Sequence, residues 1–260
     1  GLRFDLSPDA DLPEKEPNDT AETAQQIEVG SVVNGVLDAI GGRDRYRFKA
    51  PAGTVLYVDA YASSLGSPLK PNLTVRSGSD GSTVAQASYG TNTTRWAALQ
   101  SRDPSIILKP AEACVYEVEV SDASGRSGDD LLYRLRVGPP QPDFRVWMTP
   151  SSLNIPADGS ALVTVYVQRI HGFNGEVRVA LDYPPLSIAC EGGVIPAGAS
   201  FCKMTVSTDG VRYPRTVFGL PLTATAEIDG RPAKRADLPV RFESAGRAPR
   251  VFGELSARAS

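Results

Sequence analysis

Residues 114–120 read CVYEVEV, and this stretch decides the fold class because apolar and charged side chains alternate along it. Successive side chains of a β-strand point to opposite faces, so this period of two predicts one apolar face and one face that carries Glu117 and Glu119. Residues 45–49 and 131–137 alternate in the same way, with basic side chains on the polar face. Such segments are typical of half-buried antiparallel strands. We expect their Arg and Glu rows to form a solvated sheet face with some pairing across strands.

The composition supports an all-β protein. The 260 residues include 24 glycines and 21 prolines, and 41% of them are hydrophobic. Frequent turn residues between short apolar segments indicate many short strands packed around real cores. Residues 20–28 form the one segment that we predict as a short helix, starting at the Asn18-Asp19 cap. No segment has the apolar length of a membrane span.

A proline-rich run, GPPQP at residues 138–142, predicts the boundary between two domains. Its three prolines lack backbone donors, so the run fits a semi-rigid linker better than a sheet. We expect two β-sandwich domains in tandem. They comprise a first domain at residues 1–138 with its core at 12–138, a linker at 139–142, a second domain at 143–243 and a tail at 244–260.

The second domain shows regularly spaced strand and turn signals. We expect strands at residues 144–149, 153–156, 160–169, 176–182, 200–207, 217–226 and 236–243. About seven short strands in about 100 residues indicate an immunoglobulin-like sandwich. The Cys…Trp…Cys spacing of antibody domains is absent, so the sandwich would lack their disulfide between the sheets.

The most acidic part of the chain reads EKEPNDT at residues 14–20. It places three carboxylates and one amide oxygen within six residues, around Pro17, which biases Glu16 toward extended geometry. Oxygens on a bent backbone can converge on a hard cation such as Ca²⁺, which takes six to eight oxygen ligands. A solvated acidic linker that caps the short helix is the other interpretation. The local residues by themselves favour the linker.

Catalytic signatures are missing from the sequence. His171 is the only histidine, and no Cys/His spacing suits a zinc site. No G-x-S-x-G elbow, P-loop or dinucleotide-binding glycine motif is present. The formal net charge of −3 lacks the basic footprint of a nucleic-acid binder. We therefore predict a protein that is not an enzyme and does not bind nucleic acid.

Cysteine and tyrosine positions leave two further questions open. Cys190 and Cys202 flank a stretch that can fold back on itself, so they form either a disulfide or two buried thiols in neighbouring strands. Tyr57 and Tyr61 share one face of a strand expected at residues 54–62. With Trp96 they either form an aromatic platform for an extracellular protein or polysaccharide, or pack under a loop.

Several separate pieces of the first domain, over about residues 12–138, together resemble the bacterial pre-peptidase C-terminal domain. The pieces are Glu16-Pro17-Asn18-Asp19-Thr20 with Ala24, Gly35 before Asp44-Arg45-Tyr46-Arg47-Phe48, Ala52-Gly53, Leu65-Gly66-Ser67-Pro68-Leu69 leading to Leu73, Asp80-Gly81, and Tyr133-Arg134-Leu135. The second domain resembles the immunoglobulin-like partner found downstream of this module. That likeness is carried by Asp143-Phe144, Gly159-Ser160, Arg169 with Gly172-Phe173 and Gly175, and Ile195-Pro196-Ala197-Gly198.

The resemblance implies a jelly-roll-like β-sandwich that flanks exported enzymes and is not itself catalytic. The related collagen-binding domains of collagenases bind Ca²⁺ through the same E-x-E-P-N pattern. Carried onto this chain, the resemblance implies a Ca²⁺ site at Glu14, Glu16, Asn18, Asp19 and Asp44, with Asp38 as a looser candidate. The expected function is that of an accessory or adhesion module of a larger extracytoplasmic protein, with the neighbouring domains of that protein as its partners. Gly1 is not an initiator residue, which fits a processed chain or a piece of a longer one.

Overall fold

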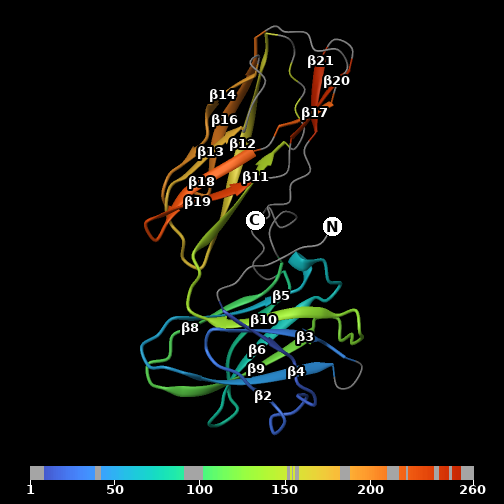
Figure 1. Cartoon of the computed structure of the whole chain (residues 1–260), viewed down its shortest axis with the longest axis vertical. Helices are drawn as coiled ribbons and strands as arrows, with labels where there is room; N and C mark the ends of the chain where they lie inside the picture. Colours follow the sequence, from blue (N-terminus) through green and yellow to red (C-terminus); the bar gives the residue numbers. More distant parts are fainter. Residues whose placement is uncertain are drawn as a thin grey trace. The chain divides into compact units, whose positions relative to one another are not determined.

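The computed structural model of the chain is built almost entirely of β-strands and divides into two compact units (Figure 1). The first unit spans Gly1–Pro140 and the second Gln141–Ser260, so the division lies inside the predicted linker. The structure describes residues 9–38, 42–90, 102–150, 153, 155, 158–181, 188–209, 217–220, 222–236, 240–245 and 248–252. The prediction of an all-β protein with β-sandwich domains is confirmed.

The first unit is a sandwich of two five-stranded sheets, seen as two layers in Figure 1. One sheet contains, in spatial order, β1 (Ala10–Pro13), β3 (Ser31–Val36), β10 (Leu132–Gly138), β5 (Leu56–Tyr61) and β8 (Ser105–Leu108). The other contains β2 (Gln25–Gln26), β4 (Arg43–Ala50), β9 (Cys114–Asp122), β6 (Pro71–Ser77) and β7 (Thr83–Ser88). Among these described strands, β1 runs parallel to β3 and β2 runs parallel to β4, each at one edge of its sheet. The other neighbouring pairs are antiparallel.

The alternation in the sequence explains this packing. On β9, Val118 and Val120 are fully buried, and on β5 Val58 and Ala60 are too. These side chains from the two sheets belong to one hydrophobic core, as expected when each strand turns every second residue inward. A single short 3₁₀ helix, η1 (Ser63–Leu65), follows β5 in the described part of the unit.

The polar face of the second sheet differs from our expectation of a solvated surface. Glu117 and Glu119 on the central strand β9 are only 5% and 6% exposed. Arg45 on β4 lies 3.0 Å from Glu117 and 2.8 Å from Glu119, and Arg76 on β6 lies 3.0 Å from Glu119. The strand register places these arginines beside the glutamates on both sides, so their side chains cover the carboxylates. This face is an ion-pair network in which buried glutamates are covered by partly exposed arginines.

The predicted helix at residues 20–28 is wrong. Thr20 and Thr23 exchange hydrogen bonds between backbone and hydroxyl groups and close a turn. The chain then enters β2, which pairs with Tyr46 and Arg47 of β4. Local threonine bonds compete with helix formation, and the free edge of β4 offers backbone partners that a short isolated helix lacks.

The second unit contains two four-stranded antiparallel sheets that share a second core. One consists of β11 (Asp143–Thr149), β12 (Ser160–Ile170), β16 (Phe201–Thr208) and β14 (Ile188–Gly192). The other consists of β15 (Val194–Ile195), β13 (Val177–Leu181), β18 (Leu222–Ile228) and β19 (Arg231–Ala236). Val165 and Met204 from the first sheet and Val177 and Leu222 from the second are buried in this core.

A three-stranded sheet follows in the C-terminal part of this unit. It is formed by β17 (Val217–Leu220), β20 (Val240–Ala245) and β21 (Ala248–Phe252). β21 lies in the region that we predicted as a tail. The predicted strand at residues 217–226 is divided between β17 and β18. The immunoglobulin-like class of this unit stays a prediction.

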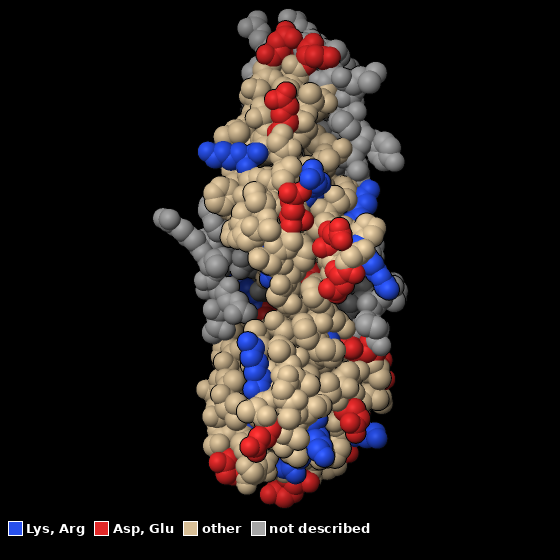
Figure 2. Space-filling view, turned by 90° about the vertical axis from the view of Figure 1, so that its left-hand side faces the viewer, with Lys and Arg blue, Asp and Glu red and all other residues tan. Residues whose placement is uncertain are grey.

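The described residues were compared with the requirements for a membrane-spanning helix and for a basic surface. Among the residues that the structure describes, no helix has the length and apolar character needed to cross a membrane. On the face shown in Figure 2, basic and acidic side chains are scattered between large uncharged areas and do not merge into one continuous basic surface.

Candidate metal centre

The candidate centre lies at one end of the first sandwich, where β4 begins. Asp44 lies on the same face of β4 as Tyr46 and Phe48, because alternate residues of a strand share a face. Its side chain therefore points inward, and Asp44 is 1% exposed. A carboxylate on the core side of a sandwich is costly unless polar groups or a cation surround it. The groups that surround Asp44 come from the segment after β1 and from β10.

Backbone and side-chain hydrogen bonds hold the acidic segment against the sandwich. The Glu14 amide donates to the Asn34 carbonyl at 3.1 Å, and the Val36 amide donates to Glu14 Oε2 at 2.8 Å. Further along, the Arg45 amide donates to the Asn18 carbonyl at 2.9 Å. The segment is therefore attached to both sheets, and Asn18 has no exposed surface.

Two tyrosines connect the carboxylates. Tyr46 Oη donates to Glu14 Oε1 at 2.6 Å, and Tyr133 Oη donates to the same oxygen at 2.9 Å. Tyr133 Oη also bonds to Asp44 Oδ2 and to Tyr46 Oη. Two phenolic protons thus serve four close oxygen pairs, and a proton on Asp44 supplies a third donor.

The protonation of the cluster follows from burial and like charge. Burial, opposed by the Tyr133 hydrogen bond and reinforced by Glu14 and Glu16, raises the pKa of Asp44 to about 8. Burial also raises the pKa of Glu16. The hydrogen bond from the Asn18 amide lowers it, and the charges of Glu14, Asp38 and Asp19 raise it. Tyr46 and Tyr133 have pKa values well above the usual range, mainly because they are buried. The cluster therefore retains a proton at neutral pH that a bound cation would displace.

The predicted ligands converge. Glu14, Glu16 and Asp44 each place a carboxylate oxygen within 4.8 Å of the other two. Asn18 Oδ1 and Asp19 Oδ1 are buried and lack a hydrogen-bond partner. Buried oxygens are normally satisfied, so these two fit a missing cation. All the donor atoms are hard oxygens, as Ca²⁺ requires, and thus the residues fit this ion. Asp38 influences Glu16 but does not belong to the converging group.

Sequence reasoning did not identify the two tyrosines as part of the centre. Tyr46 was visible only as a core position, and Tyr133 only as part of the motif near the end of the domain. Gly35 is a sequence feature linked to the position of Tyr133, because a Cβ at residue 35 would lie 2.6 Å from Tyr133 Oη. The glycine therefore leaves the space in which the Tyr133 ring reaches Glu14 and Asp44.

The structure does not support the aromatic platform. A platform needs exposed rings, whereas Tyr57 is 9% exposed and Tyr61 is half-buried. Both side chains lie on the outer face of β5, where neighbouring groups cover them. Trp96 lies outside the described residues.

The disulfide is also not found, since Cys190 and Cys202 are free thiols. Cys190 is paired with Val206 in the register of β14 and β16, four residues from Cys202. At about 3.4 Å per strand residue, this offset is roughly 14 Å, well beyond the reach of a disulfide. Both thiols pack against the second core, as in the alternative interpretation.

Comparisons with known proteins include two distant structural similarities. No protein-family model matches the chain, and no curated protein matches it. The pre-peptidase C-terminal domain of a collagenase from Bacillus anthracis has 14% identity and a TM-score of 0.34, and the alignment covers 48% of this chain and 99% of that one. A protein from Eubacterium rectale, assigned provisionally as secreted, has 11% identity and a TM-score of 0.31, with 97% of this chain and 87% of that one covered. Similarities at this level carry no argument about function, which is therefore inferred from the residues of this chain.

Proposed function

We propose that the first unit is a non-catalytic accessory module of a larger exported protein and that Ca²⁺ binds at Glu14, Glu16 and Asp44, with Asn18 and Asp19 as further ligands. The observation that carries the proposal is the convergence of three carboxylates within 4.8 Å. Asn18 and Asp19, close in sequence to Glu16, each carry a buried side-chain oxygen without a hydrogen-bond partner. The ordered motifs that resemble the pre-peptidase C-terminal domain support the same function.

The ion would attach the N-terminal segment to the sandwich. Glu14 and Glu16 lie on the segment that follows β1, whereas Asp44 lies on β4. One cation bound by all three would link this segment to the second sheet and neutralise carboxylates that repel one another. The segment enters the module from the N-terminal side of the chain. A rigid segment would therefore stabilise or position whatever domain precedes it.

Location and partners follow from this function. The module would act outside the cytoplasm, where Ca²⁺ is available to sites of modest affinity. Its partners would be neighbouring domains of the parent protein, and adhesion to extracellular material would be the role of the assembled protein.

Thermal unfolding with Ca²⁺ and with a chelator tests the metal site. At a Ca²⁺ concentration 100 times the Kd, binding to the folded state alone adds about 2.7 kcal/mol. For a unit of 140 residues, this corresponds to a rise in Tm of about 9 °C, from an unfolding entropy of about 2.1 cal/mol/K per residue. Glu16→Gln should remove most of the rise, because Glu16 is an exposed ligand whose replacement should not prevent folding.

Glu28→Gln is the matched control, since Glu28 is an exposed carboxylate outside the converging group. This variant should keep the full response to Ca²⁺. An identical Tm in Ca²⁺ and chelator, together with no ion bound in a calorimetric titration, would refute the calcium site.

A further inference from the structure

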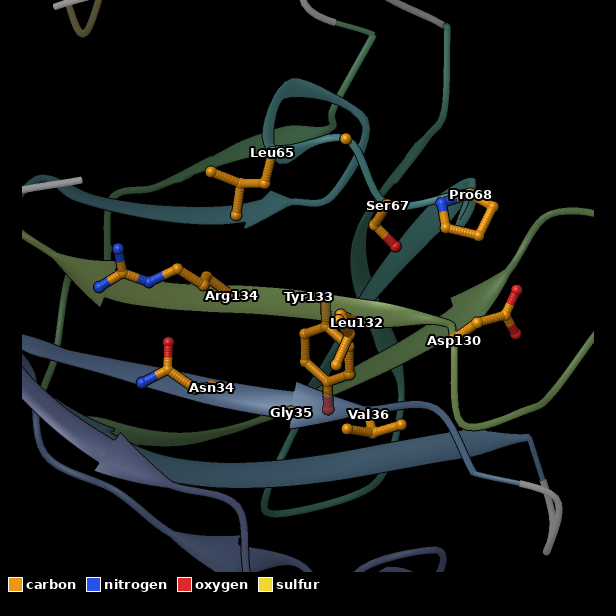
Figure 3. Close-up of a pocket in the computed structure, with 11 residues that line it drawn as sticks. Asn34, Gly35, Val36, Leu65, Ser67, Pro68, Asp130, Leu132, Tyr133 and Arg134 are labelled. Atoms are coloured by element: carbon orange, nitrogen blue, oxygen red, sulfur yellow. The ribbon is translucent and has the colours of Figure 1, made fainter. Parts of the chain in front are cut away.

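A groove of about 420 Å³ lies on the outer face of the first sheet of the first unit. Its floor is formed by Val36 of β3 and Leu132 of β10, and its wall by Leu65 and Pro68 (Figure 3). Leu132, the first residue of the central strand β10, is 53% exposed. The groove is therefore an apolar surface that the described part of the unit leaves uncovered.

The wall of the groove is preformed. Asp103 accepts hydrogen bonds from the Ser63 amide at 2.9 Å, the Ser63 hydroxyl at 2.8 Å and the Ser64 amide at 3.0 Å. These bonds fix η1, from which Leu65 extends over the groove. At the other end of the wall, Arg126 Nη2 donates to the Pro68 carbonyl at 2.6 Å. A fixed wall lowers the entropic cost of binding, because no loop must be ordered.

The two ends of the groove differ in charge. At one end, Arg134 Nη2 lies 2.7 Å from Asp11 Oδ1, which also accepts a bond from Asn34, so the cation is neutralised there. At the other end, Figure 3 shows Asp130 at the edge of the groove. Asp130 is exposed, and the described residues provide no ion pair for it. The groove thus combines an apolar centre with one uncompensated negative end.

The size of the groove limits its occupant. A cavity of about 150 Å³ accommodates benzene, so 420 Å³ has room for one apolar side chain and the backbone that carries it. An isolated hydrophobic molecule would leave the carboxylate at the end unused. A chain with a cation adjacent to the apolar group would pair with Asp130 while its apolar group covers Leu132.

We propose that this groove binds an extended segment of a protein partner in which an apolar side chain is followed by lysine or arginine. The apolar side chain lies on Val36 and Leu132 under Leu65, and the basic side chain reaches Asp130. This activity goes beyond the stabilising role of the module. The groove contains none of the proposed cation ligands, although the Val36 amide and Tyr133, which line it, also bond to Glu14 of the candidate centre.

The test uses the full ¹⁵N-labelled chain and the peptide acetyl-Gly-Leu-Lys-Gly-amide, with binding followed by backbone amide shifts. The largest shifts should occur at Val36, Leu65 and Leu132. The same peptide with glutamate in place of lysine should have an affinity at least about three times lower, as expected for one exposed charge pair. The peptide with serine in place of leucine should bind about tenfold more weakly, since it loses the apolar contact.

Variants of the chain separate the two contacts. Leu132→Thr keeps a residue suited to a strand but removes the apolar floor, and it should weaken binding about tenfold. Ile107→Thr is the matched control, because Ile107 is 52% exposed on β8 of the same sheet but does not line the groove. Asp130→Asn should remove the preference for lysine over glutamate while it retains the preference for leucine over serine.

Equal affinities for the lysine and glutamate peptides, or unchanged binding by Leu132→Thr, would overturn the proposal. Shifts that cluster away from the groove would do the same. All titrations are run with Ca²⁺ and with chelator, and binding is expected in both. The groove and the calcium site can therefore fail independently.

Discussion

Replacing Asp44 by asparagine gives a sharp test of the electrostatics at the candidate metal centre. In the folded chain without a cation, burial and two neighbouring carboxylates raise the pKa of Asp44 from 3.8 to about 8. At pH 7 the carboxyl group is thus ionised in the unfolded chain and mainly protonated in the folded one. Folding must take up this proton, which opposes folding increasingly as the pH rises.

The sign and size of the effect follow from linkage. The raised pKa costs nothing well below pH 3.8, and the cost grows up to about pH 8. At pH 7 it amounts to about 4 kcal/mol, at about 1.4 kcal/mol per pKa unit. Asparagine does not titrate, and its side chain can accept from Tyr133 and donate to Glu14. Asp44→Asn should therefore raise the free energy of unfolding of the calcium-free protein at pH 7, by about 4 kcal/mol at most.

Calcium should narrow this difference in stability between the variant and the wild type. Under the proposed function, the ion would stabilise the wild-type protein by binding three carboxylates, whereas the variant has lost one of them. Stability in chelator should thus be higher for Asp44→Asn, and the increase produced by Ca²⁺ should be larger for the wild type. A residue that destabilises the free protein and stabilises the bound one is expected at a binding site but not at a structural position.

Urea unfolding of the full chain, followed by circular dichroism between pH 4 and pH 8, measures both effects. The transition of the second unit should not respond to the substitution and serves as an internal control. The reasoning would be refuted if Asp44→Asn were no more stable than the wild type in chelator at pH 7. A stability difference that does not change between pH 4 and pH 8 would refute it equally.

Two further substitutions test the packing. Glu119→Gln should lower the free energy of unfolding by about 2 kcal/mol in a urea titration, because partly exposed arginines lose a buried partner. The exposed control Glu112→Gln should change it by less than about 0.5 kcal/mol, and equal effects would contradict the ion-pair network. Gly35→Ala should cost about 2 to 3 kcal/mol and weaken Ca²⁺ binding, because a Cβ would displace the Tyr133 ring. If calorimetry gave Gly35→Ala the same Ca²⁺ affinity as the wild type, the position of the Tyr133 ring would not be required for Ca²⁺ binding.

Part of the metal centre could be predicted before the structure. Glu14 and Glu16 belong to a recognisable motif, and Asp44 precedes the Tyr46-Arg47-Phe48 strand, where its parity predicts an inward position. Tyr133 could not be predicted, because its contact with Asp44 spans 89 residues and depends on how the two sheets pack. Spacing along the chain does not encode such a distance.

The errors also have physical causes. The helix predicted after the acidic segment failed because Thr20 and Thr23 close a turn and β4 offers an edge to β2. The disulfide failed because Cys190 and Cys202 occupy different positions in the register of paired strands. Tyr57 was placed correctly on the outer face of its strand, but burial there depends on neighbours that come from other parts of the chain.

The sequence by itself determined the all-β class, and it predicted a division at the proline-rich run and the acidic residues of the candidate centre. Those properties depend on local alternation, on the backbone limits of proline and on residues close together in a motif. Only the tertiary structure decided that the Arg and Glu rows form an ion-pair network with buried glutamates, that Tyr133 joins Glu14 to Asp44 and that Leu132 lies in an open groove. Each of these depends on strand register and sheet packing, which bring together side chains that the sequence keeps far apart.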